Sequence, residues 1–377
     1  MIDPYSTGKG FVLFSGANDR AVLALCRGFE KHNVPFGLIA RGEDDLLRKS
    51  RYADRFLAVR TSEDLRFEDV VTAAQKGNER YGVGHWVVCA TSEYLNIRLF
   101  AFTERLLAEG IEVSTCDRDL YMRVSDKGSF RSYSTELGVA PPSILQWGDE
   151  GSLSLGFVAK PLQNLSPEGR ILYPYLVRTP LERRQFLDEP SRDRYYLERF
   201  IHGESWYLLY YFKSDGSFTM GAQRNYLQQG KGKSILVASS EQYPDSEVPL
   251  RFSNALTRDG YRGFIMIELK RTAQGESVAI EANPRCWGPF QLTLDAGMGL
   301  FEAYLEDHGI RPRSSAKGRS AFYCWTGGSV QALRSGKGLD LHASWLLTFL
   351  TATRALFSDV YARRGSWSCF VSDLCRS

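Results

Sequence analysis

The chain lacks most of the features that would assign it to a specialised class of protein. Its seven cysteines are odd in number and form no CxxC pair, which argues against a disulfide framework or a zinc module and favours a reducing cytoplasm. The 47 Lys and Arg residues against 44 Asp and Glu residues leave a net charge of +3, too small to predict nucleic acid or membrane binding. No internal repeat or long low-complexity tract is present.

Long apolar segments are also missing. Residues 1–9 are polar and lead directly into an apolar run, so we expect no signal segment. The most apolar late stretch, residues 345–357, is too short to span a bilayer and contains Arg354, so we expect a packed helix there and no membrane span. With 43% hydrophobic residues in 377, the chain is long enough for two or three globular domains.

What is present at the start of the chain is an alternation of apolar runs and helical patterns. An apolar run at residues 11–14 ends in a glycine turn, a helical pattern follows through Phe29, and a second run covers residues 35–40. Helices at 65–79 and 93–109 around a strand at 86–90 continue the order, which predicts a parallel α/β sheet ending near Thr115. Only Gly16 stands where a dinucleotide fingerprint needs several glycines, so an NAD-dependent oxidoreductase is disfavoured.

The middle of the chain offers several candidate binding residues. Residues 117–145 predict helix, turn and helix, and Lys160 ends the short strand 157–161, where it either meets an anion or is a surface lysine. In residues 195–204 a strand runs through Glu198 into a glycine turn with Glu204. This segment can offer backbone groups to a purine and carboxylates to a ribose, or it can simply flank a crossover between domains.

Two antiparallel strands, 205–212 and 217–226, come next. Arg224 lies near the end of the second strand, and the glycine- and lysine-rich stretch 228–234 follows. We expect this stretch to be mobile, either closing over phosphates or serving as a plain linker. Arg224, Arg20 and Lys231 are candidates to meet a substrate carboxylate.

The most informative stretch covers residues 263–288. Alternating apolar runs at 264–270 and 277–283 flank a turn at 273–275, which predicts a β-hairpin. If the turn is centred between Gln274 and Gly275, Glu268 lies directly opposite Glu281. The expected buried face then consists of Ile265, Ile267, Leu269, Val278 and Ile280.

The opposite face of this hairpin carries the chemistry. Two facing carboxylates repel each other unless a cation lies between them. Mg²⁺ binds one or two carboxylates and completes its shell with water and substrate phosphates, and the amide oxygen of Asn283 is a further candidate ligand. The alternative is a hairpin with a solvated, charged face, but acid, amide and the guanidinium of Arg285 converge on one strand end, which favours the metal.

These motifs resemble the ATP-grasp superfamily over roughly residues 10–305. The most specific element is Glu268 followed by the run Glu281-Ala282-Asn283-Pro284-Arg285; residues 198–201 resemble the hinge between the subdomains, residues 158–161 the phosphate-lysine strand, and Asp126-Lys127 the start of the grasp domain. The resemblance implies an α/β and α+β ATP-grasp fold. Its parts would be a Rossmann-like N-terminal domain at 1–115, a small subdomain at 116–195, a large subdomain at 196–310 and a C-terminal extension at 311–377.

The resemblance also implies roles for individual residues. Lys127 and Lys160 would bind the phosphates of ATP, and Arg285 would stabilise an acyl phosphate or the transferring phosphoryl group. Mg²⁺, with Mn²⁺ as an alternative, would be held by Glu268, Glu281 and Asn283. Adenosine would be bound by the backbone of Arg199, Phe200 and Ile201, by Glu198 at the adenine amino group and by Glu204 at the ribose hydroxyls.

The implied activity is ATP- and Mg²⁺-dependent coupling of a small-molecule carboxylate to an amine, in biosynthesis of a metabolite, natural product or cell-surface component. Such chemistry needs positioning and charge neutralisation and no protein nucleophile. We expect a cytoplasmic enzyme, a homodimer by default. The alternative is an ATP-binding protein of this fold without turnover, a regulator or assembly partner. The acid, amide and arginine set favours the enzyme, and the single glycine in residues 163–169, where relatives carry a glycine-rich lid, keeps the alternative open.

Overall fold

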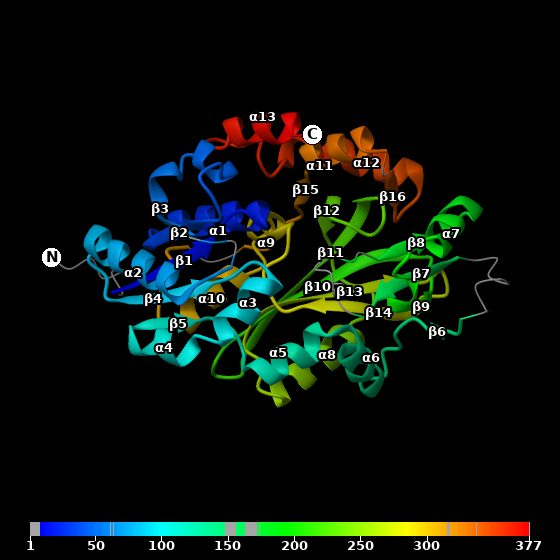
Figure 1. The fold of residues 1–377 in the computed structure, drawn as a ribbon, viewed down its shortest axis with the longest axis horizontal. Coiled ribbons are helices and arrows are strands. Elements are labelled where there is room, and N and C mark those ends of the chain that lie inside the picture. Colours follow the sequence, from blue (N-terminus) through cyan, green and yellow to red (C-terminus); the bar gives the residue numbers. More distant parts are fainter. Residues whose placement is uncertain are drawn as a thin grey trace.

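The computed structural model describes residues 8–60, 62, 64–147, 156–162, 172, 174–314, 317–336 and 338–376. The described residues form three sheets (Figure 1): a parallel sheet at one end of the elongated molecule, a small antiparallel sheet at the other, and a large antiparallel sheet between them. The loop expected at 163–169 lies outside the described residues.

The N-terminal sheet is the parallel α/β sheet that the alternation predicts. Its strand order is β3-β2-β1-β4-β5, and both faces of β1 are buried, which explains its continuous apolar run. The structure differs from the expectation in two respects: the helix expected at 93–109 is divided into two, and the edge strands β3 and β5 were not expected. The elements are β1 (Lys9–Phe14), α1 (Asp19–His32), β2 (Phe36–Ala40), η1 (Leu46–Lys49), η2 (Ala53–Arg55), β3 (Phe56–Val59), α2 (Phe67–Tyr81), β4 (His85–Cys89), α3 (Glu93–Phe100), α4 (Thr103–Ala108) and β5 (Ile111–Val113).

The small sheet has the order β6-β9-β7-β8, with antiparallel pairing throughout. Phe186 is fully buried at its centre and contacts the rings of Phe157, Tyr175 and Tyr195. Two helices precede the sheet. The elements are α5 (Arg118–Ser125), α6 (Lys127–Glu136), β6 (Ile144–Leu145), β7 (Phe157–Pro161), β8 (Tyr175–Val177), α7 (Pro180–Leu187), η4 (Arg192–Arg194) and β9 (Tyr195–Arg199).

The large sheet has the order β14-β13-β10-β11-β12-β15, and β16 pairs with β11. Alternate residues of β10 enter two different cores: Trp206 and Leu208 face a core shared with α5, α6 and α8, while Tyr207 and Leu209 face one shared with α1, α9 and α10. The elements are β10 (Glu204–Phe212), β11 (Phe218–Gln229), β12 (Ile235–Ser240), α8 (Glu247–Arg258), β13 (Gly263–Arg271), β14 (Ser277–Asn283), α9 (Phe290–Ala296) and α10 (Leu300–Asp307).

The hairpin of β13 and β14 has the expected pairing of Glu268 with Glu281, reached through a β-bulge. Leu269 pairs with Ala279, so Ile280 is an extra residue on β14. The extra residue shifts the alternation, and Ala279 and Ala282 enter the core in place of the expected pair. The expected burial is therefore confirmed for Ile265, Ile267 and Leu269 and is wrong for Val278 and Ile280.

The C-terminal residues extend the large sheet and cover one edge of the molecule (Figure 1). The helix expected at 345–357 is present and packs on β12 and β15. It does so through Thr348, Thr351 and Ala355, whereas its bulky apolar side chains are exposed. No helix in the described ranges is long and apolar enough to cross a membrane. The elements are β15 (Phe322–Cys324), α11 (Thr326–Arg334), β16 (Leu339–Leu341), α12 (Trp345–Ala355), η5 (Leu356–Ser358) and α13 (Trp367–Cys375).

Candidate functional site

The Glu281 carboxyl group lies where three cavities meet. A cavity of about 690 Å³ lies on the side of α5 and α6, one of about 160 Å³ lies between the small and large sheets, and one of about 670 Å³ faces the N-terminal domain. Glu281 lines all three, and Glu268 lines the second and third. We refer to them as the helix cavity, the hinge cavity and the N-domain cavity.

The paired acids of the hairpin form an anionic centre. Burial, and then the neighbouring Glu281 carboxylate, raise the pKa of Glu268 to about 7. A hydrogen-bonded chain continues along β14: the Asn283 amide donates to Glu281 (Nδ2 to Oε1, 2.8 Å), and Arg285 donates to Asn283 (Nη2 to Oδ1, 2.9 Å). The signature residues thus hold one another in place.

The carboxylates of Glu268 and Glu281 suit an Mg²⁺ ion that binds together with phosphates. Within the described residues there is no group of three or more His, Cys, Asp or Glu side chains able to hold a metal without further ligands. Two facing carboxylates suit an ion that takes its remaining ligands from water and a polyphosphate. The Asn283 oxygen already accepts from Arg285, so the two carboxylates are the better candidates for direct ligands.

Lys160 is held by a buried ion-pair triad. Its ammonium lies 2.8 Å from Glu198 Oε2, and the Arg131 guanidinium lies 2.7 Å from Glu198 Oε1. The Glu198 side chain is 2% exposed. Its two oxygens are therefore both engaged by cations, and in this structure Glu198 orients Lys160 within the hinge cavity.

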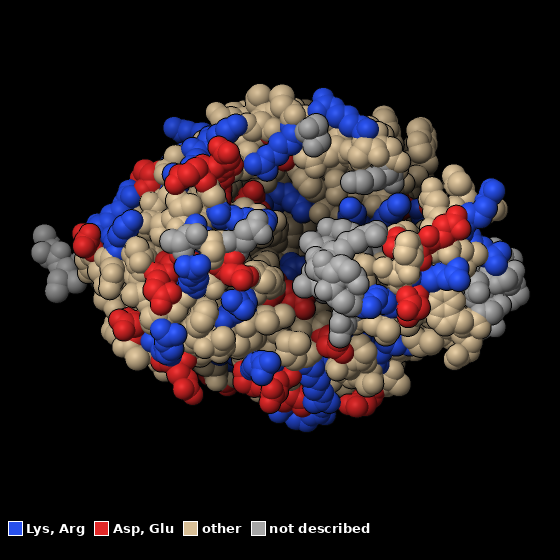
Figure 2. Space-filling view, viewed as in Figure 1, with Lys and Arg blue, Asp and Glu red and all other residues tan. Residues whose placement is uncertain are grey.

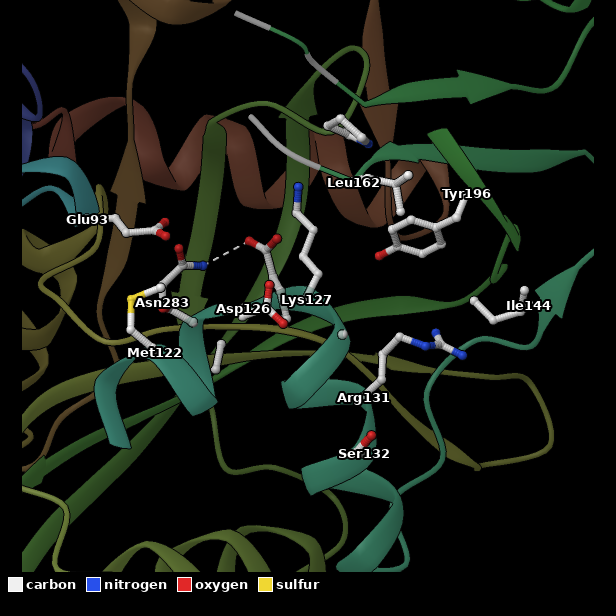
Figure 3. A pocket seen from close by; sticks show the side chains of 15 residues that line it. Glu93, Met122, Asp126, Lys127, Arg131, Ser132, Ile144, Leu162, Tyr196 and Asn283 are labelled. Carbon is white, nitrogen blue, oxygen red and sulfur yellow. Dashed lines mark hydrogen bonds between the residues drawn. The ribbon is translucent and has the colours of Figure 1, made fainter. Parts of the chain in front are cut away.

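The helix cavity gathers residues from three parts of the chain (Figure 3). Asp126 accepts from Ser129 N and caps α6, which places Lys127 at the first position of that helix with its side chain reaching into the cavity. Glu93, the first residue of α3, points into the cavity toward Asn283. Burial lowers the pKa of Lys127 and raises the pKa of Glu93. Both groups thus lie in a partly desolvated site.

The hinge cavity includes residues from the C-terminal strand β16. Arg178, which directly follows β8 of the small sheet, lies 2.6 Å from Asp340 Oδ1, while Asp340 Oδ2 is buried with no hydrogen-bond partner in the described structure. His342 contacts Lys270 (Nδ1 to Nζ, 3.0 Å) and Gln228 (Nε2 to Oε1, 2.6 Å). Burial, and then Lys270, lower the pKa of His342 to about 3, so this imidazole is neutral at pH 7.

The N-domain cavity combines fixed cations with buried polar groups. Arg20 stacks 3.8 Å above the Trp325 ring and donates to Ser234 Oγ (2.9 Å) and the Tyr323 hydroxyl (3.2 Å). Thr91 Oγ1 and Trp287 Nε1 line this cavity and are buried without a hydrogen-bond partner within the described ranges. Such groups are costly unless a ligand or water satisfies them.

Most of the residues expected to form the site are brought together by the fold. The hinge cavity is lined by Lys160, Glu198, Arg199, Phe200, Ile201, Glu268 and Glu281; the other two cavities add Lys127, Asn283 and Arg285. The candidates Arg20 and Lys231 also line a cavity. The stretch expected as a mobile loop at 228–234 contains the end of β11 and a tight turn at 231–232, closed by a hydrogen bond from Gln229 N to Ser234 O (3.0 Å).

Glu204 and Arg224 are not part of this assembly. Tyr207 pairs with Glu268 and faces the site, so Trp206 and its partner Arg224 face the other side of the sheet. There Arg224 binds Glu204 (Nη2 to Oε1, 2.5 Å), and Trp206 Nε1 donates to Glu204 (3.0 Å). The placement of Glu204 at a ribose and of Arg224 at a substrate therefore has no support in the geometry.

The sequence analysis missed several cavity residues. Glu93 had a usable signal, because it follows the end of β4 and ligands of parallel sheets gather at the carboxyl ends of strands. Arg131 and Arg178 lie on helical or loop segments without a motif. Asp340 lies in a three-residue strand, too short to show a period, and His342 directly follows it; nothing in the sequence pointed to either residue.

A parallel N-terminal sheet followed by two antiparallel lobes, with facing acids on the last hairpin, is the ATP-grasp fold, as the resemblance implied. Comparison with solved structures gives the same result. The chain is similar to biotin carboxylase from Campylobacter jejuni in complex with β,γ-ATP (TM-score 0.58, 15% identity, 84% of this chain and 75% of that one).

Two further solved structures show the same likeness. One is the biotin carboxylase domain dimer of 2-oxoglutarate carboxylase from Hydrogenobacter thermophilus with MgADP, ADP and bicarbonate (TM-score 0.57, 14% identity, 84% and 74% covered). The other is an ADP complex of N5-carboxyaminoimidazole ribonucleotide synthetase (TM-score 0.60, 12% identity, 93% and 96% covered). No family model matches the sequence, and no curated protein matches it in a sequence search.

Proposed function

We propose that the protein is an ATP- and Mg²⁺-dependent ligase that activates a carboxylate as an acyl phosphate and couples it to an amine. The single observation that carries the proposal is the placement of Glu268 and Glu281 face to face, with Glu281 lining all three cavities and Glu268 lining two of them. Lys127, Lys160 and Arg285 surround this point and supply positive charge. Phosphoryl transfer requires this combination of positioning and neutralised charge.

In this proposal the adenosine of ATP occupies the hinge cavity. The segment Arg199 to Ile201 offers backbone groups to the adenine edge, and Ile280, turned outward by the bulge, offers apolar contact. Because Glu204 lies on the far face of the sheet, we assign the ribose hydroxyls to the buried free oxygen of Asp340. Lys127 and Lys160 then bind the phosphates beside the paired acids.

The reaction consists of two displacements. An oxygen of the substrate carboxylate attacks the γ-phosphorus; a new O–P bond forms, the bond to the β,γ-bridging oxygen breaks, and ADP leaves. The amine then attacks the acyl carbon, the C–O bond to phosphate breaks, and an amide, inorganic phosphate and a proton result. Mg²⁺, or Mn²⁺ in its place, would be held by Glu268 and Glu281 and neutralise phosphate charge. Arg285, fixed by Asn283, stabilises the acyl phosphate.

The N-domain cavity is the place proposed for the carboxylate and amine substrates. Arg20 and Arg285 present cationic groups to it, and Glu93 presents an acid. Thr91 and Trp287 add one hydroxyl and one indole N–H that have no partner in the described structure. Small polar substrates are favoured over apolar ones. A biosynthetic role in the cytoplasm and a homodimer complete the proposal.

The alternative function is an ATP-binding protein of this fold without turnover. A phosphate-release assay with ATP, Mg²⁺ and pooled carboxylic acids and amines distinguishes the two, with Glu281→Gln as the test variant and Glu276→Gln, exposed on the same hairpin, as the matched control. We expect release that requires both an acid and an amine, a loss of at least ~100-fold in Glu281→Gln, and unchanged release in Glu276→Gln. ATP binding by calorimetry without release from any pool would favour the alternative, and full activity of a folded Glu281→Gln variant would refute the metal assignment.

A further inference from the structure

The helix α12 presents its apolar side to solvent. The side chains buried beneath it are small or hydroxylated: Thr348, Thr351 and Ala355. A surface helix of a globular protein normally has the reverse arrangement, with its apolar stripe against the core. The outward residues, including those of η5, are Trp345 (69% exposed), Leu346 (59%), Phe349 (53%), Leu350 (47%), Leu356 (56%) and Phe357 (95%).

We call these six outward residues the α12 stripe. Leu346, Phe349 and Leu350 are three and four positions apart and lie along one side of α12; the exposed Thr353 follows on that side, and Leu356 and Phe357 come from the adjoining turn η5. The rings of Trp345 and Phe349 stack with centroids 5.7 Å apart. Scattered exposed apolar residues need no explanation, but a contiguous aromatic and aliphatic stripe indicates a surface that is covered in use.

The C-terminal segment that carries the stripe is rich in basic residues and poor in acidic ones. Residues 311–377 contain ten of the 47 Lys and Arg residues of the chain and only three of its 44 Asp and Glu residues. Those three acids, Asp340, Asp359 and Asp373, are all buried. Figure 2 shows the corresponding edge, over α11 and α12, as tan and blue. The described residues from 317 onward therefore contain basic side chains and no exposed Asp or Glu, although one of the basic residues, Arg363, pairs with Asp295 of α9 (Nη2 to Oδ2, 2.6 Å).

This charge pattern decides between the possible occupants. A second copy of the chain docked through the same stripe would bring like charges of the two C-terminal segments together, with no exposed acid in either segment to neutralise them. Outward Trp, Phe and Leu side chains beside Arg complement a partner whose interior is apolar and whose surface carries negative charge. Lipid bilayers with anionic headgroups have this structure, and helices that present Trp, Phe and Leu beside basic residues lie in their interfacial layer.

We propose that the α12 stripe docks the protein on an anionic lipid surface, with Trp345, Phe349 and Phe357 inserted at the level of the acyl chains and Arg354 at the headgroups. The association is peripheral, since the helix has only 11 residues. It is independent of the proposed ligase activity, because none of the inserted residues lines a cavity of the site. Failure of either proposal therefore leaves the other intact.

The test is flotation of the full chain with vesicles of phosphatidylcholine alone and of phosphatidylcholine with 30–40% phosphatidylglycerol, a composition chosen on the order of natural anionic membranes. We expect binding to the anionic vesicles only, at least ~10-fold weaker in Phe349→Ser and in Phe357→Ser, and several-fold weaker in Arg354→Gln. Leu107→Ser on α4, 65% exposed in the wild type, is the matched apolar control, and Lys76→Gln on α2 is the charge control; both should bind as the wild type does.

Three outcomes would overturn the proposal. The first is no binding to anionic vesicles by a folded protein, as judged by circular dichroism. The second is equal binding of the Phe349→Ser and Leu107→Ser variants, which would place the contact elsewhere. The third is a concentration-dependent dimer in light scattering that Phe349→Ser abolishes, because a second copy would then cover the stripe. Phosphate release measured on the same variants without vesicles reports separately on the site.

Discussion

The ion-pair triad around Glu198 makes a prediction whose size follows from the structure. Glu198 is 2% exposed and binds Lys160 at 2.8 Å and Arg131 at 2.7 Å. In Glu198→Gln both cations lose their counter-charge in a buried site. Removing one member of a buried ion pair typically costs about 3–5 kcal/mol. We therefore expect the free energy of unfolding to fall by about that amount.

The neighbouring variant should behave differently. In Arg131→Met, Glu198 keeps Lys160 as a partner, so only one charge-assisted hydrogen bond is lost, and we expect a decrease of about 1.5–3 kcal/mol. Glu247→Gln is the control, because Glu247 also pairs with an arginine (Arg251, 3.2 Å) but is 76% exposed. An exposed pair of this kind contributes at most about 0.5 kcal/mol.

The measurement is urea unfolding of the three variants, with and without saturating ATP and Mg²⁺. If Lys160 binds phosphate, ATP should replace part of the missing negative charge, and the loss in Glu198→Gln should be smaller with ATP than without it. A Glu198→Gln variant as stable as Glu247→Gln would refute the reasoning, because the triad would then not be a buried, coupled unit. An equal decrease in the free energy of unfolding with and without ATP would show that Lys160 does not bind the phosphates.

Further predictions follow from the other cavities. Asp340→Asn should weaken the contacts of β16 with Arg178 and with the ribose by an energy on the order of 1 kcal/mol, and so raise the Michaelis constant for ATP about fivefold. An unchanged Michaelis constant in steady-state kinetics would contradict the assignment of Asp340 to the ribose. His342, whose folded pKa of about 3 lies below its unfolded value, takes up a proton only on unfolding, so stability falls as the pH drops below 6.5. His342→Gln should remove up to about 2 kcal/mol of the loss between pH 7 and pH 5, as measured by urea titrations at both pH values. In Gly288→Ala the new Cβ would lie 3.0 Å from Arg20 Nη2, so substrate affinity should fall while thermal stability stays near the wild type; unchanged kinetics would remove Arg20 from the site.

The central hairpin shows how far sequence reasoning reaches. Alternation and turn chemistry were sufficient to pair Glu268 with Glu281, because both strands carry clear apolar periods. The bulge at Ile280 was not predictable, since an extra residue leaves no mark in the pattern until its partner strand is known. The pairing of the acids was correct, but on the turn side of the bulge the buried residue of β14 is Ala279, where Val278 and Ile280 were expected.

The predicted role of Glu204 at the ribose lacks support for a related reason. Whether a strand residue faces the site depends on which neighbour the strand pairs with and in which register. Only the pairing of Tyr207 with Glu268 shows that Glu204 and Arg224 belong to the far face, where they bind each other. A short motif in the sequence gives the type of each residue but does not show which face of the sheet its side chain lies on. Resemblance to a motif therefore predicts the position of the backbone more safely than the role of a side chain.

The C-terminal residues were the least predictable part and are connected to every part of the molecule discussed above. Their strand β16 supplies Asp340 to the hinge cavity, and Trp325 and Tyr323 fix Arg20 in the N-domain cavity. Their helix α12 rests on β12 and β15 through small side chains, which leaves its bulky ones outward. An apolar helix that faces solvent can be distinguished from one that faces the core by the small or hydroxylated residues on one of its sides. In α12 these residues are Thr348, Thr351 and Ala355, and they mark the buried side. The segment expected as a C-terminal extension therefore contributes residues to the site. Its basic and apolar composition points to a binding surface, which the net charge of +3 for the whole chain does not indicate.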